Sequence, residues 1–297
     1  IAVPILTMRS MAEERHSRTD QLVLTAPVSL GKMIFGKFLA MVGVFTVAVA
    51  VIAVTPLVLA AFGTVPLGEN YVAVLGFWLY GCTCIAVGML ASALTESQVI
   101  AAVVAFAFLF LGYMMNSITG LIGDHLVTKV LGAYDLYTPL QSFMSGCLDL
   151  TGVVYFVSVT GLCLFLTCQC VQKRRWSMTT KKLTTGMFSV AMIVVGFAVA
   201  VAVNLVVKEM PSSWTAVDAT STKLYSLTDT TKDYVKNLSQ DVTIYVLSSE
   251  KSADSTLAET LQRYEDLSKH LKVVYKDPAK SPNFYQQYTD SAPSQNS

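Results

Sequence analysis

Five long apolar runs, each without Asp, Glu, Lys, Arg or His, most constrain what this chain can fold into. They are Phe38–Phe62, Tyr71–Leu94, Gln98–Ile122, Gly152–Val171 and Met187–Val207. Each has about 20 to 25 residues, enough for a helix to cross a bilayer core of about 30 Å. Lipid offers backbone groups no hydrogen-bond partner, so we expect transmembrane helices. Small residues predict close packing of these helices in a bundle: Gly43, Gly76, Gly81, Gly88, Ala101, Ala102, Ala105 and Gly161.

The composition agrees with this interpretation. The 297 residues are 53% hydrophobic and 14% charged, which is too apolar for one soluble domain of this length. The net charge of +1 argues against nucleic acid as a partner. The chain opens at Ile1 without a signal-peptide pattern and closes on a polar stretch. We therefore expect a fragment that lacks sequence at both ends.

The distribution of basic residues predicts the orientation in the membrane. Met8–Ser29, the residues up to Lys37, Thr95–Ser97 and Gln172–Gly186 together hold ten Lys and Arg, whereas the short loops on the other side hold one, Lys129. Cytoplasmic loops carry the excess of Lys and Arg. We therefore expect a multi-pass protein of the cell membrane, with those basic segments in the cytoplasm and residues 208–297 outside it.

Asp124–Leu150 is about half apolar but is interrupted by Gly132 and Pro139. It is therefore expected to form short re-entrant or interfacial helices rather than a span. A loop that rests on the bilayer remains the alternative. Two polar residues inside the spans, Asn116 and Asn204, are expected to make hydrogen bonds between helices.

The sequence after Val207 has the pattern of a soluble domain. Ser226 and Asp229 have capping-box spacing before a helix with an apolar face of Leu227, Tyr234, Val235 and Leu238. A strand is expected at Val242–Leu247, an amphipathic helix at Asp254–His270 and a second strand at Leu271–Tyr275. A strand–helix–strand order favours a parallel pair. The predicted fold class is an all-α polytopic membrane bundle followed by a small α/β extracytoplasmic domain.

The polar, basic segment Met8–Ser29 lies between an apolar stretch and the first long run. Arg9–Leu24 lacks Gly and Pro, so a short helix is expected there, and Ala26-Pro27 should stop it. On these grounds alone a solvated loop between two spans is an alternative.

Within this segment Ala12-Glu13-Glu14-Arg15, Thr19, Leu22, Leu24 and Pro27-Val28 resemble the cytoplasmic segment between the second and third spans of type-two ABC exporter permeases. In that family the segment is a coupling helix that docks on the ATPase subunit. The resemblance implies a coupling segment at 8–33. It also implies ATPase contacts by these residues: Glu13, Glu14, Arg15, Thr19, Leu22, Leu24 and Pro27. Arg18 stands where the family usually has Gly. Glu96 is a second cytoplasmic contact candidate, by its position alone.

The C-terminal part resembles a second family. Tyr225-Ser-Leu-Thr-Asp-Thr-Thr, Asp241-Val-Thr-Ile-Tyr245, Leu261-x-x-Tyr264 and Asp277-Pro278 look like the start of the auxiliary subunit of gliding-motility-type ABC transporters. The resemblances imply a permease domain at 1–175, a cytoplasmic linker and membrane anchor at 176–207, and an extracytoplasmic auxiliary domain at 208–297.

Motifs for catalysis and metal binding are absent from the sequence. Leu30-Gly31-Lys32-Met33 lacks the spacing of a phosphate-binding loop, and no hydrolase motif occurs. Cys82-x-Cys84 and Cys168-x-Cys170 lie within apolar runs and far from any His, which disfavours a metal site. We therefore expect no enzymatic activity and no cofactor on this chain, with ATP and magnesium on a partner ATPase.

The predicted function is that of a transmembrane permease subunit of an ATP-driven ABC exporter. The expected partners are an ABC ATPase, a second permease chain and membrane lipid. One alternative is a membrane-anchored scaffold that binds envelope polymer. The other is an ion-coupled carrier, which the lack of charge within the spans disfavours.

Overall fold

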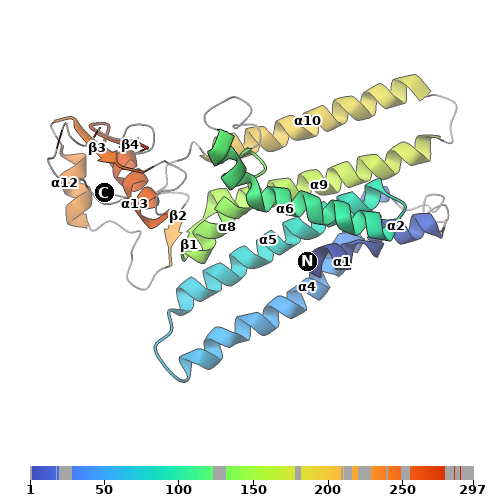
Figure 1. The fold of residues 1–297 in the computed structure, drawn as a ribbon, viewed down its shortest axis with the longest axis horizontal. Helices are drawn as coiled ribbons and strands as arrows, with labels where there is room; N and C mark the ends of the chain where they lie inside the picture. The colour runs from blue at the N-terminus through green and yellow to red at the C-terminus, as the bar shows by residue number, and fades with distance from the viewer. Residues whose placement is uncertain are drawn as a thin grey trace.

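The computed structural model shows a bundle of long helices with a smaller unit of strands and helices at one end (Figure 1). This arrangement confirms the predicted fold class. The described residues are 2–17, 19, 29–122, 132–177, 182–208, 210, 216–219, 229–238, 240–248, 255–277, 284 and 288.

In the described part of the chain, four helices are long and apolar enough to cross a membrane: α4 (Leu30–Ala60), α5 (Leu67–Leu94), α6 (Gln98–Ile122) and α9 (Leu150–Ser177). The fifth predicted run lies in α10 (Lys182–Lys208), which carries a shorter apolar stretch, Ala191–Val207. The protein is therefore a multi-pass membrane protein.

The first span begins earlier than its apolar run. Ile34, Phe38 and Val42 are all buried and follow one another at a spacing of four residues, so one helical face continues back to Leu30. The last four residues of the predicted coupling segment 8–33 thus form the first turn of α4.

The helix α5 forms the centre of the bundle (Figure 1). In the most apolar 18-residue stretch of each helix, 61% of α5 is buried, against 17% of α4 and 22% of each of α6 and α9. Three glycines explain how close its neighbours come. A Cβ at Gly76 would lie 2.3 Å from Cβ of Phe143, one at Gly81 would lie 2.1 Å from the Phe45 ring, and one at Gly88 would lie 2.2 Å from Oγ1 of Thr7.

The prediction of close packing at small residues is therefore confirmed on α5, and Ala101 and Ala105 are also buried. It is wrong for Gly43 and Gly161, where an added Cβ would meet nothing within 4 Å. Small size permits a close approach but does not create one. The polar residue Asn204 does make the expected contact between helices, since its Nδ2 donates to Oγ of Ser158 at 2.6 Å.

At one end of the bundle a short helix, α8 (Tyr137–Met144), packs against α5, α6 and α9. Its Phe143 is fully buried against Gly76 and Gly152. This finding confirms a short helix in the segment Asp124–Leu150, and its position relative to the membrane stays a prediction; residues 124–131 lie outside the described part. Strand β1 (Cys147–Asp149) follows directly after Gly146, whose φ of 80° favours glycine.

The C-terminal unit comprises α12 (Asp229–Lys236), β3 (Val242–Val246), α13 (Ser255–Leu267) and β4 (Leu271–Tyr275). Strands β3 and β4 are parallel, and Val242 lies opposite Leu271. The predicted order and direction are confirmed, although α13 is shorter than Asp254–His270. One residue of the predicted apolar face is misplaced, because Tyr234 is 75% exposed whereas Val235 is buried.

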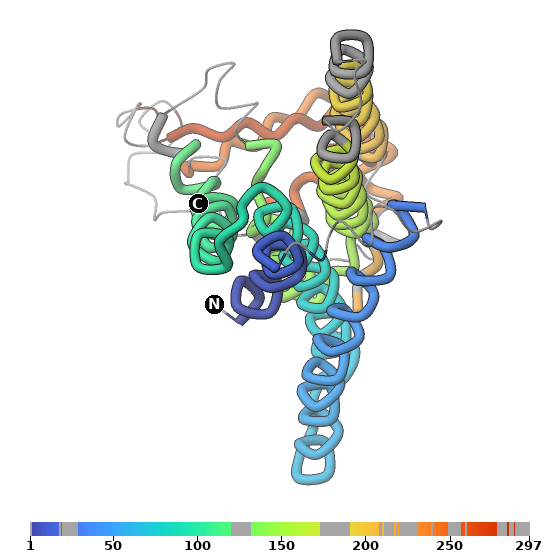
Figure 2. Tube along the Cα trace, turned by 90° about the vertical axis from the view of Figure 1, so that its right-hand side faces the viewer, coloured from blue at the N-terminus to red at the C-terminus, as the bar shows by residue number. Residues whose placement is uncertain are grey.

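A strand that the sequence reasoning missed, β2 (Ala216–Asp218), follows α10 and pairs antiparallel with β1. This pair lies at the end of the bundle opposite α1 (Ala2–Thr7) and α2 (Arg9–His16), as Figure 1 shows. Figure 2 looks onto the α1–α2 end and shows both short helices against the ends of the long ones.

Candidate functional site

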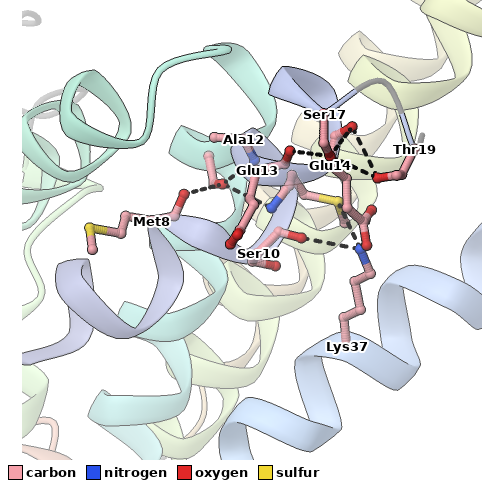
Figure 3. Close-up of polar contacts among 10 residues, drawn as sticks. Met8, Ser10, Ala12, Glu13, Glu14, Ser17, Thr19 and Lys37 are labelled. Carbon is pink, nitrogen blue, oxygen red and sulfur yellow. Dashed lines mark hydrogen bonds and ion pairs between the residues drawn. The ribbon is translucent and has the colours of Figure 1, made fainter.

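The candidate site is the α2 junction, which we define as residues 8–17 and 19, the start of α4 up to Lys37, and residues 92–97 at the end of α5. Helix α2 ends at His16 and not at Leu24. The physical reason lies in two hydroxyls that compete for helix carbonyls. Ser17 Oγ donates to the carbonyl of Glu13 at 2.8 Å, and Thr19 Oγ1 donates to that of Glu14 at 3.3 Å (Figure 3).

The N-terminus of α2 is capped by a residue of another helix. Its own N-cap position, Met8, has no side chain that can accept a hydrogen bond from the first turn. Instead, Ser92 Oγ on α5 accepts hydrogen bonds from the N–H groups of Met11 and Ala12, both at 3.0 Å, and donates to the carbonyl of Met8 at 3.1 Å. Ser92 and Ala12 are fully buried. Ser92 thereby satisfies donors that a helix start would otherwise leave unpaired.

The C-terminus of α5 is capped in turn by a residue of α2. The guanidinium of Arg15 donates to the carbonyl of Thr95 at 2.9 Å and to that of Ala93. Thr95 is the C-cap residue, with extended backbone, so these carbonyls have no partner within the helix. A cation at this position also interacts favourably with the negative end of the helix dipole.

An ion pair joins α2 to the start of α4. Lys37 Nζ lies 2.5 Å from Glu14 Oε2 and donates to the carbonyl of Ser10 at 3.1 Å (Figure 3). The two side chains are 24% and 32% exposed. Because Lys37 lies on α4 whereas Arg15 binds α5, α2 is attached to two different membrane spans.

A close approach of α1 to α5 lies directly beside the junction. Thr7 is fully buried at Gly88, in the space that a larger residue would occupy. Met11 packs with Ile34 and Phe38 of α4 and with Ile85 and Met89 of α5 in one buried cluster. Residues 8–16, the described first part of the segment Met8–Ser29, are therefore packed against the bundle and do not form a solvated loop.

The sequence-predicted site residues divide into three groups. Glu14 and Arg15 have partners inside the chain, as described above. Glu13, Thr19 and Glu96 are exposed, and Glu96 follows directly after the Thr95 carbonyl that Arg15 binds. Leu22, Leu24 and Pro27 lie outside the described residues.

The sequence reasoning missed Ser92 and Lys37, and it missed Thr7 as the partner of Gly88. Ser92 lies in an apolar run, where a serine carries no evident signal. A sequence signal for this cap does exist: neither Met8 nor Arg9 is a residue that caps a helix start, so the cap of α2 has to come from elsewhere in the chain. Within the described residues, no three His, Cys, Asp or Glu side chains lie close enough together to bind a metal ion.

Comparison with known families gives two matches. A model described as "ABC-2 family transporter protein" matches residues 1–172, more than half of the chain. A model described as "Domain of unknown function (DUF7088)" matches residues 221–296. No curated protein and no solved structure matches.

Proposed function

Because this chain belongs to the ABC-2 family of transporter proteins, we propose that it is the permease subunit of an ATP-driven export system. A separate ABC ATPase binds the nucleotide and magnesium, and a second permease chain completes the pathway. The basic α2 end faces the cytoplasm of the cell membrane, and residues 208–297 lie outside it.

One observation carries this proposal: α2 and α5 cap each other's ends, while α2 is also paired with α4. A force applied to α2 from the cytoplasm would reach the most buried span directly, through hydrogen bonds that are only about 3 Å long. Closure of an ATPase dimer is a source of such a force. A solvated loop would have absorbed the same displacement.

The predicted coupling residues take different roles in this mechanism. Exposed Glu13 and Thr19 on the α2 side, and Glu96 on the α5 side, contact the ATPase. Glu14 and Arg15 transmit the movement of α2 to α4 and α5. Leu22, Leu24 and Pro27 supply apolar contacts to the ATPase, as the family resemblance implies.

We further propose that the C-terminal unit is the beginning of a gliding-motility-type auxiliary domain, with α10 as its membrane anchor. The parallel β3–β4 pair and its helical crossover support this proposal. The family match to this region carries no function of its own.

The test is co-purification of the detergent-solubilised protein with an ABC ATPase of the same organism. We expect the wild-type chain to retain the ATPase and the charge reversals Glu13→Lys and Glu96→Lys to release it. Asp233→Lys is the matched control, because Asp233 is exposed on α12 at the other end of the molecule. If no ATPase binds the wild type with ATP, with ADP or without nucleotide, the proposal fails. Full function with residues 8–29 scrambled would favour a scaffold instead.

A further inference from the structure

The C-terminal unit has a second attachment besides α10. Strand β2, which leads into this unit, pairs with β1, which lies between α8 and α9. The register places Asp218 opposite Cys147 and Ala216 opposite Asp149. The N–H of Ala219 extends the pairing with a hydrogen bond of 3.2 Å to the carbonyl of Gly146.

The residue that follows β2 is partly buried and packs against an apolar cluster of the bundle. Ala219 lies against a buried cluster of Val72, Leu140, Phe143 and Phe156, which come from α5, α8 and α9. Its carbonyl approaches the start of α5 so closely that a Cβ at Gly68 would lie 2.7 Å from it. The contact is therefore more than a pair of strands at the surface.

Helix α13 of the C-terminal unit also contacts β1. Nη2 of Arg263 on α13 lies 3.7 Å from Sγ of Cys147, a fully buried residue of β1. The β1–β2 pair thus lies between the bundle and α13, and it contacts both.

We propose that the β1–β2 pair docks the C-terminal unit onto the end of the bundle opposite α2, so that this unit moves with α8 and α9 as one body. Attachment through α10 alone would not fix the orientation of this unit relative to α8. Strand pairing fixes both its direction and its register relative to α8. Since α5 contacts α2 at one end and α8 at the other, movement of α5 would displace the C-terminal unit too.

The register provides a direct test by cross-linking to a native cysteine. The Ala219–Gly146 hydrogen bond makes the next pair, Cys147 and Asp218, a non-hydrogen-bonded pair, in which Cα atoms lie about 4.5 Å apart. This separation suits a disulfide. In the full-length protein, Asp218→Cys should form a disulfide with Cys147 on addition of copper phenanthroline. Neither of these two thiols should then react with a maleimide reagent. Peptide mass spectrometry should identify the bridge.

Val217→Cys is the matched control, because it lies one residue away and its side chain points to the opposite face of the strand. It should leave the Cys147 thiol free. The proposal is overturned if Asp218→Cys gives no bridge, or if both variants bridge equally, since the latter would indicate a mobile segment. Hydrogen exchange on the unsubstituted protein provides an independent measurement. Slow exchange at Ala219 supports the docking, and exchange at the rate of an unstructured peptide contradicts it.

Movement as one body is tested in the complex with the ATPase, and only this part rests on the proposed function. The bridged fraction of Asp218→Cys should be the same without nucleotide and with ATP plus vanadate. A loss of bridging with vanadate would show that the unit separates from α8 during the cycle, which overturns the proposal. If no ATPase binds at all, the proposed function fails, while the result without nucleotide still decides the docking.

Discussion

Ser92 of α5 caps the start of α2, and Arg15 of α2 caps the end of α5, so the two helices stabilise each other's termini. Reciprocal capping makes the two ends one structural unit, although nearly 80 residues separate them in the sequence. Unfolding of the end of α5 would leave N–H groups of α2 without Ser92, and unfolding of α2 would leave carbonyls of α5 without Arg15.

Replacing Ser92 by alanine should destabilise the α2 junction. The substitution leaves two N–H groups of α2 and the Met8 carbonyl without their partner, and each buried unpaired group costs about 1–3 kcal/mol. We expect a lower thermal unfolding temperature in detergent and faster hydrogen exchange in residues 8–16. Ser117→Ala, at an exposed position of α6, is the control and should leave both measurements unchanged.

Replacing Arg15 by lysine should not preserve its role, because a single ammonium group cannot reproduce the planar fork that reaches two carbonyls. Arg15→Ala should lower stability by about 1.5–3 kcal/mol, the usual contribution of hydrogen bonds to a charged group, and Arg15→Lys should recover only part of this loss. Thermal unfolding measures both. Arg9→Ala tests an exposed arginine of the same helix; an equal loss there would refute a specific capping role.

Breaking the Glu14–Lys37 pair should affect coupling more than stability. Because both side chains are partly exposed, the pair contributes no more than about 1 kcal/mol to folding. Glu14→Gln should therefore unfold near the wild-type temperature yet reduce the response of the bound ATPase to the permease. The charge swap Glu14→Lys/Lys37→Glu should restore part of that response. A swap no better than Lys37→Glu alone would argue against the ion pair.

Gly88→Ala should destabilise the protein, because the added methyl group would overlap Thr7. Overpacking of this kind costs about 1–3 kcal/mol. Gly43→Ala introduces the same group on α4 into open space and should be neutral or stabilising, since alanine favours a helix by about 1 kcal/mol over glycine. Thermal unfolding of the two variants separates close packing from helix propensity, and equal effects would contradict the Thr7 contact.

Asn204→Leu should loosen α10 from α9. The substitution removes the hydrogen bond to Ser158, and such bonds between membrane helices contribute about 0.6 to 2 kcal/mol. Limited proteolysis between the two helices should become faster. Ser158→Ala should give a similar effect, and the double variant should lose little more than either single one.

Apolar periodicity and charge predicted the spans, their order and the parallel β3–β4 pair. Burial in lipid or in a sheet selects apolar residues at a regular spacing, and this spacing can be seen in the local sequence. The local sequence did not predict contacts between residues that lie far apart in the chain. Ser92 acts through three backbone groups of α2, and β2 exists because β1 lies beside it. The end of α2 at His16 depends on hydroxyls that helix propensity treats only as weakly unfavourable.

The burial of α5 also has a consequence for biosynthesis. The chain is synthesised from its N-terminus, so α5 is made before α6, α8 and α9, the helices that cover parts of its surface in the finished bundle. Its sequence must therefore satisfy the insertion machinery first and its final helical neighbours afterwards. Its glycines are small enough for Thr7, Phe45 and Phe143 to approach closely in the finished bundle. A substitution on this helix can therefore act in two ways, through membrane insertion and through packing against the neighbouring helices.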